Sequence, residues 1–272
     1  MPPSTASEPV AHVPVRRIDV RGLEVAYRRR GEGPPLLYMH GLGLSQRWLA
    51  LYERLSRGCD VVVPDHPGFG DSAPAAWMRD FDDLVLHYAE LADLLGLGAF
   101  HLVGHSFGGW VAAEFASFYP ERVTSLTLVT PLGLRVPGEA PADLFRMGTE
   151  ARLELMFNGR AEAFFGRGTD EERLERLLQD YADLTAFGRF AWNPRYDIRL
   201  DRRLGRIMSP ALVIGAEEDR VLPASHIARY AELLPNARVA VVGERGTPTG
   251  HAVVAEEPEA VALLIETIMG GQ

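Results

Sequence analysis

The chain has 272 residues, of which 47% are hydrophobic and 24% are charged, so it is long enough for one globular domain or one domain with a large insertion. Its formal net charge of −9 argues against nucleic acid or an anionic membrane as the main partner. All 28 basic residues are arginine, which excludes Schiff-base or pyridoxal-phosphate chemistry on a lysine of this chain.

The cysteine content and the first residues suggest a compartment. Cys59 is the one cysteine, so an internal disulfide and a thiolate metal cluster are both excluded. Residues 1–15 are rich in proline and small residues and lack the features of a signal peptide, so we expect a flexible segment there. No apolar run approaches the length that spans a bilayer. We therefore expect a cytoplasmic protein with no membrane partner, no metal and no cofactor.

Short apolar runs alternate with helical patterns along the chain. The runs predict eight strands, at residues 17–20, 23–29, 36–39, 60–63, 100–103, 123–129, 211–214 and 238–242. The helical patterns lie at residues 81–95, 107–118, 225–234 and after Pro258. Because strands separated by helices form parallel crossover units, we predict an α/β fold with a mostly parallel, eight-stranded open sheet flanked by helices.

The pattern changes between residues 131 and 206, where no strand signal appears and the helical segments are highly charged. We predict that this stretch is a helical insertion after the sixth strand, and that residues 16–130 and 207–272 form the core. The stretch also carries dispersed aromatic and methionine residues, namely Phe145, Met147, Met156, Phe157, Phe164, Phe165, Tyr181, Phe187, Phe190 and Trp192.

A G-x-S-x-G motif, Gly104-His105-Ser106-Phe107-Gly108, lies between a predicted strand and a predicted helix. A serine hydroxyl is a poor nucleophile until a neighbouring base takes its proton. A strained strand–turn–helix junction lifts the serine clear of the sheet, and small residues on both sides let the backbone turn tightly. Ser106 is therefore the candidate nucleophile.

An acyl-transfer serine needs a base, a group that orients the base, and hydrogen-bond donors for the oxyanion. Active residues of a parallel sheet gather at the carboxyl ends of its strands. Asp219 follows the predicted 211–214 strand and His251 follows the 238–242 strand, in the chain order serine, acid, histidine. Glu217 and Glu218 stand next to Asp219 and are rival acids.

Five motifs in this order resemble the α/β-hydrolase fold superfamily over most of the chain. They are His40-Gly41-Leu42-Gly43 for the oxyanion loop, residues 65–72 for a turn, residues 104–109 for the nucleophile elbow, Asp219 with Pro223 for the acid loop, and Gly250-His251 with residues 256–259 for the histidine loop. The resemblance implies that Ser106 attacks the substrate carbonyl, that His251 accepts its proton, and that Asp219 orients the imidazole. It also implies an oxyanion hole made by the backbone N–H groups of Leu42 and Phe107, and a cap at residues 131–206.

The chain departs from this family pattern in two places. Residues 243–250 are longer and more polar than the usual approach to the histidine, which bears on the position of His251 and on the pocket mouth. Thr130-Pro131 stands where some relatives place the acid. Threonine cannot fill that role, which favours Asp219.

The remaining histidines near the motifs are expected to be structural. His40 is expected to hold the oxyanion loop, and His105 to pack in the elbow or make a modest substrate contact. Four further histidines have neither the spacing of metal ligands nor partner cysteines, so we do not expect them to bind a metal: His66, His87, His101 and His226.

A serine at the elbow removes the haloalkane dehalogenases and epoxide hydrolases of this superfamily, which use an aspartate there. We expect a serine hydrolase acting on a small apolar carboxylic ester or lactone, because the cap aromatics imply an apolar pocket. A carbon–carbon bond hydrolase that cleaves a diketone would use the same three residues and stays an alternative. Acyl transfer to another acceptor, perhydrolysis and a non-turnover small-molecule receptor are further alternatives.

Overall fold

The computed structural model describes residues 12–243 and 249–270 of the chain. Most of the predicted flexible segment (residues 1–11) and the middle of the long approach to His251 (residues 244–248) lie outside the described residues. Among the helices of the described part, none is long and apolar enough to cross a bilayer.

One sheet of eight strands organises the molecule, in the order β1-β2-β4-β3-β5-β6-β7-β8. β1 and β2 are antiparallel to each other and β2 is antiparallel to β4, whereas the remaining neighbours are parallel. The predicted fold class is therefore confirmed. The strands are β1 (Arg16–Val20), β2 (Leu23–Arg30), β3 (Pro35–Met39), β4 (Asp60–Pro64), β5 (Phe100–His105), β6 (Val123–Val129), β7 (Ala211–Ala216) and β8 (Ala237–Val242).

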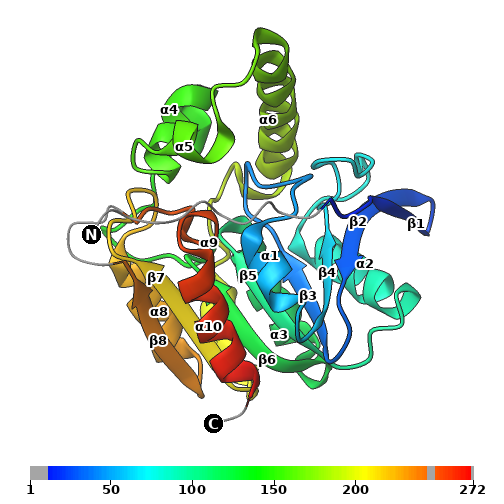
Figure 1. The fold of residues 1–272 in the computed structure, drawn as a ribbon. Helices are drawn as coiled ribbons and strands as arrows, with labels where there is room; N and C mark the ends of the chain where they lie inside the picture. Colours follow the sequence, from blue (N-terminus) through cyan, green and yellow to red (C-terminus); the bar gives the residue numbers. More distant parts are fainter. Residues whose placement is uncertain (1–11, 244–248, 271–272) are drawn as a thin grey trace.

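Helices cover both faces of the sheet (Figure 1). α2, α3 and α8 pack on one face, while α1 and α10 pack together on the other. The sequence patterns did not predict α1 and α9, since helices of six and four residues are too short to display a period. The helices are α1 (Ala50–Leu55), α2 (Phe81–Leu94), α3 (Phe107–Phe118), α4 (Thr149–Met156), α5 (Ala161–Phe165), α6 (Asp170–Ala191), α7 (Leu200–Arg203), α8 (Ala224–Leu233), α9 (Val253–Glu256) and α10 (Pro258–Met269).

The chain between β6 and β7 is helical, as its sequence predicts. Figure 1 shows α4, α5 and α6 standing together at one end of the sheet. The short helix α7 contacts α3. An isolated parallel bridge joins Gly133 to Tyr196 near the two ends of this stretch. The limits of a separate cap unit at residues 131 and 206 stay a prediction.

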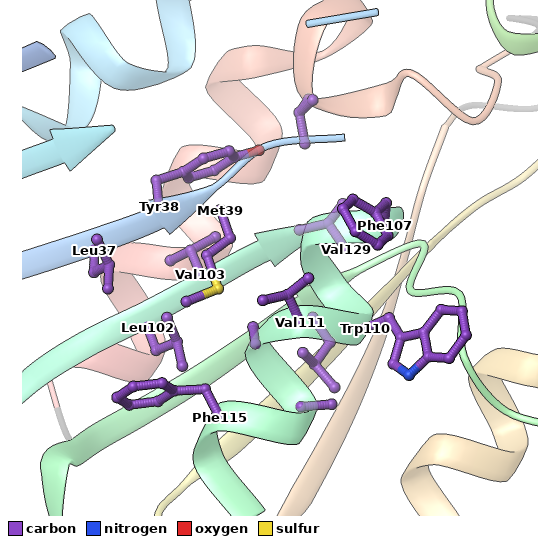
Figure 2. Close-up of a cluster of buried hydrophobic side chains, with 14 of the residues drawn as sticks. Leu37, Tyr38, Met39, Leu102, Val103, Phe107, Trp110, Val111, Phe115 and Val129 are labelled. Carbon is purple, nitrogen blue, oxygen red and sulfur yellow. The ribbon is translucent and has the colours of Figure 1, made fainter. Parts of the chain in front are cut away.

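One half of the core lies between the central strands and α3, and the other half lies between the sheet and helices α1 and α10. Figure 2 shows Leu37 and Met39 of β3 and Leu102 of β5 packed beside Val111 and Phe115 of α3. These side chains are all buried, and so are Leu36 and Tyr38 of β3, whose positions alternate with them. Burial of both faces explains why β3 appears in the sequence as a continuous apolar run rather than as an alternating pattern.

The register of the central strands brings their carboxyl ends to one edge. Met39 of β3 pairs with Gly104 of β5, and Val129 of β6 pairs with both His105 and Ile214. The loops after β3, β5 and β7 therefore begin side by side, and these loops carry the motifs identified in the sequence.

Candidate active site

Ser106 stands at a tight turn between β5 and α3. Its backbone has φ 55° and ψ −115°, a conformation that non-glycine residues seldom adopt. The two motif glycines permit the turn: a Cβ on Gly104 would lie 2.3 Å from the Gly108 oxygen, and one on Gly108 would lie 2.1 Å from the Met39 oxygen. The close packing of the elbow explains why the motif needs glycine at both positions.

Three predicted residues meet at the sheet edge. The Ser106 hydroxyl lies 2.7 Å from Nε2 of His251, and Nδ1 of the same ring lies 2.8 Å from Oδ2 of Asp219. Ser106 and His251 are buried, and the Asp219 side chain is 6% exposed. A carboxylate accepts the Nδ1 proton, so Nε2 is left as an acceptor for the serine proton.

The backbone of the acid loop fixes the Asp219 carboxylate. Its Oδ1 accepts the N–H groups of Val221 and Leu222, both at 2.8 Å, while Oδ2 faces the imidazole. The rival acids Glu217 and Glu218 are exposed. Within the described part of the chain, neither carboxylate is hydrogen-bonded to His251.

Residues of the helical insertion support the histidine loop. Glu256 accepts the Gly250 N–H at 2.7 Å and the Arg160 guanidinium at 2.6 Å, and the Ala252 N–H donates to the Met156 oxygen. Thr130, where some relatives place their acid, donates its hydroxyl to the His251 carbonyl at 3.3 Å. Sequence patterns gave no signal for these contacts, because they join segments far apart in the chain.

Two histidines hold the predicted oxyanion loop. His40 accepts the His66 N–H at Nε2 and lies 2.9 Å from the Gly41 oxygen at Nδ1, while Nε2 of His66 lies 2.8 Å from the His40 carbonyl. A Cβ on Gly41 would lie 3.0 Å from the Ser106 Cβ, so Leu42 begins beside the nucleophile. Within the described chain, neither the Leu42 amide nor the Phe107 amide at the start of α3 has a hydrogen-bond partner.

Burial favours the neutral form of His105 and His66. It lowers the pKa of His105 to about 3, with repulsion from His251 as a second cause, and it lowers the pKa of His66 well below its usual value. Nε2 of His105 lies 2.8 Å from the His251 carbonyl, so His105 supports the backbone of the histidine loop. Among described residues, no histidine, cysteine or carboxylate cluster could hold a metal ion.

Aromatic side chains of the insertion meet the elbow. The Phe107 ring lies 5.2 Å from Phe187 and 6.1 Å from Phe190 of α6, and Phe187 stacks at 4.9 Å on Phe145. These contacts cover the start of α3 with apolar surface, while the apolar substrate pocket expected from the sequence stays a prediction.

A second, polar surface lies beside the oxyanion loop and was not predicted. A cleft of about 490 Å³ separates residues 43–47 from α4, α5 and α6, and most of its lining side chains are polar or charged. At one wall, Asp183 of α6 accepts the Ser45 hydroxyl at 2.5 Å and the Gly70 N–H at 3.0 Å. Burial raises the pKa of the Asp183 carboxyl.

The arrangement can perform nucleophilic acyl chemistry: a hydroxyl, an imidazole acceptor and a fixed carboxylate lie in hydrogen-bonded series. Comparisons with known proteins find similarity to hydrolases. The model of the alpha/beta hydrolase family matches residues 36–263. A 2-hydroxy-6-oxononadienedioate/2-hydroxy-6-oxononatrienedioate hydrolase of Burkholderia vietnamiensis is 32% identical over 82% of this chain and 84% of its own length.

Other relatives act in different reactions. The dihydrolipoyllysine-residue acetyltransferase component of the acetoin cleaving system of Cupriavidus necator is 30% identical over 99% of this chain and 73% of its own length. The corresponding component of Pseudomonas putida is 33% identical over 84% of this chain, and the match spans 61% of that protein. The crystal structure of a bacterial membrane phospholipase A superimposes with a TM-score of 0.78 at 26% identity, over 95% of this chain and 86% of the other.

Proposed function

Since this chain belongs to the alpha/beta hydrolase family, we propose that it is a serine hydrolase of carboxylic esters that uses Ser106, His251 and Asp219. The observation that carries the proposal is the continuous hydrogen-bond series from the Ser106 hydroxyl through both ring nitrogens of His251 to Asp219. The buried position of the series keeps bulk water away from it.

In the proposed mechanism, His251 Nε2 takes the Ser106 proton as the serine oxygen attacks the ester carbonyl. Asp219 holds Nδ1 protonated and stabilises the imidazolium that forms. The Leu42 and Phe107 N–H groups donate to the carbonyl oxygen as it becomes negative. His251 then protonates the leaving alcohol. It next deprotonates a water molecule, whose attack on the acyl-enzyme releases the acid and restores the serine.

A carbon–carbon bond hydrolase is the second candidate. The similarity to the Burkholderia vietnamiensis hydrolase supports it, and the same three residues would serve. The two candidates differ in the group that leaves: an alkoxide in one, a stabilised carbanion in the other. Aryl esters and vinylogous diketones, compared by kcat/KM, separate them, and a preference of several orders of magnitude for a diketone would favour the second.

Covalent labelling tests the nucleophile directly. We expect a fluorophosphonate to add once to the wild-type protein, as measured by intact mass, and not at all to Ser106→Ala. Folding of the variant is checked by its circular dichroism and thermal midpoint. Equal labelling of both proteins, or no labelling of the folded wild type, would count against Ser106 as an activated serine.

A further inference from the structure

We propose that the cleft between residues 43–47 and helices α4 to α6 binds a carboxylate of the substrate, remote from the scissile carbonyl, through Arg47 and Arg176. The arginine cleft, as we name it, is defined by Gly43, Ser45, Arg47, Phe165, Arg176 and Asp183 among its lining residues. The proposal rests on the proposed ester hydrolysis and adds a substrate class to it: acid esters, in which a spacer joins the acyl carbonyl to a free carboxylate.

Arg47 and Arg176 both contact the ring of Phe165. The Arg47 guanidinium lies 4.6 Å from the centroid of the Phe165 ring, and that of Arg176 lies 5.4 Å from the same centroid. Within the described chain, neither side chain makes an ion pair, and both are half-buried. Burial and the nearby Arg176 charge lower the pKa of Arg47. Two like charges against one ring repel each other, and an anion between them relieves that repulsion.

Four carboxylates line the cleft, and three of them, Glu172, Asp180 and Asp183, have hydrogen-bond or ion-pair partners. Asp180 is paired with Arg152 and accepts the Thr149 hydroxyl, while Asp183 accepts three hydrogen bonds. Glu172 closes the capping box at the start of α6, and both it and Glu175 are exposed to water, which screens them. Arg47 and Arg176 are the positively charged residues of this lining, and within the described chain neither makes an ion pair.

The cleft lies within reach of the nucleophile. A Cβ on Gly41 would contact the Ser106 Cβ at 3.0 Å, and Gly43, two residues further, already lines the cleft. The covalent spacing of the chain limits the distance from Ser106 Cβ to Gly43 Cα to about 12 Å. This bound places the near edge of the cleft beside the nucleophile, so a substrate with a methylene spacer can place its carbonyl at Ser106 and direct its carboxylate toward the cleft.

Arginine suits this role better than any other residue. Its planar guanidinium presents paired N–H donors that match a carboxylate, and it keeps its charge when half-buried. The ring of Phe165 restricts both side chains, so less conformational entropy is lost when the anion binds.

Matched substrates test the proposal. The mono-4-nitrophenyl ester of adipic acid and 4-nitrophenyl hexanoate have acyl chains of equal length and differ in one carboxylate. We expect wild type to favour the acid ester in kcat/KM, and Arg47→Gln and Arg176→Gln each to lower that preference by about 10- to 100-fold. The loss should appear in KM of the acid ester and should exceed any change in kcat/KM for the neutral ester. Arg47→Lys, which keeps the charge, should recover part of the preference.

Arg167→Gln is the matched control, since Arg167 is an exposed arginine of the same insertion outside the arginine cleft. It should leave the preference unchanged, and the thermal midpoint of each variant checks its folding. A wild type that favours the neutral ester, or a preference that Arg47→Gln and Arg176→Gln leave intact, would overturn the proposal.

Ligand binding separates the cleft from the chemistry. Adipate is titrated calorimetrically into Ser106→Ala and into Ser106→Ala combined with Arg47→Gln or Arg176→Gln. Binding that each arginine change weakens supports the cleft even if no ester is turned over, in which case only the proposed function fails. No adipate binding, or binding of inorganic phosphate but not of adipate, would refute the carboxylate assignment while leaving the serine mechanism in place.

Discussion

Replacing Asp219 with asparagine tests the tautomer argument, because the backbone fixes which atom of the new amide faces His251. Oδ1 of Asp219 accepts two N–H groups, from Val221 and Leu222, at 2.8 Å each. An asparagine keeps its oxygen at that position only if its NH₂ group takes the place of Oδ2. The NH₂ then donates to Nδ1 of His251, the proton moves to Nε2, and the ring cannot accept the Ser106 proton.

The opposite orientation of the amide is strongly disfavoured. It would aim the NH₂ group at two backbone donors and leave both unsatisfied, at about 1–3 kcal/mol each. Even at the lower figure, roughly 3% of molecules would hold the productive tautomer at any moment. Loss of the charge that stabilises the imidazolium adds to this, and such a substitution lowers kcat by about 10⁴-fold where it has been made in a serine protease.

We therefore expect Asp219→Asn to lower kcat toward an aryl ester by about 10³- to 10⁴-fold, or about 4–5.5 kcal/mol of transition-state stabilisation, with KM little changed. Steady-state kinetics with 4-nitrophenyl esters measure this loss. Glu218→Gln removes an exposed neighbouring carboxylate and serves as the control, with an expected effect under about twofold. A loss below tenfold for Asp219→Asn, or a larger loss for Glu218→Gln, would refute the reasoning.

Two stability measurements test the buried surroundings of the elbow. Ser106→Gly and Ser106→Ala both remove the nucleophile, but only glycine relieves the backbone strain at φ 55°. The glycine variant should therefore be more stable than the alanine variant by about 0.5–2 kcal/mol in denaturant unfolding. Equal stability of the two variants would contradict strain at the elbow. Burial raises the pKa of Glu114 in α3 from 4.5 to about 7, against the opposing hydrogen bond from Arg203. Because the folded state holds the Glu114 proton more tightly than the unfolded state does, protonation of this carboxyl stabilises the folded state at low pH. This stabilisation is lost as the pH rises from 4.5 to 7. Between pH 5 and 8 the unfolding free energy of wild type should fall relative to Glu114→Gln by about 2–3 kcal/mol, and a pH-independent difference would contradict the assignment.

The sequence alone was enough to predict the main strands and the positions of the candidate site residues along them. Apolar runs such as residues 36–39 are read from local composition, because a central parallel strand is buried on both faces and has no polar alternation. Ser106, Asp219 and His251 could be placed together because strand order and the parallel register bring the ends of β5, β7 and β8 to one edge. The motif glycines allowed the elbow to be predicted, because a tight local backbone turn requires glycine at those positions.

The tertiary structure alone decided which side chains face one another around that edge. Arg47 and Arg176 are separated by more than a hundred residues, and no periodicity of either segment shows that both contact Phe165. The same holds for Asp183 with Ser45 and for Glu256 with Arg160. Short-range patterns record how each element buries its own apolar face. Contacts between polar groups of different elements depend instead on how the insertion packs on the core. The residue types within a single element do not determine that packing.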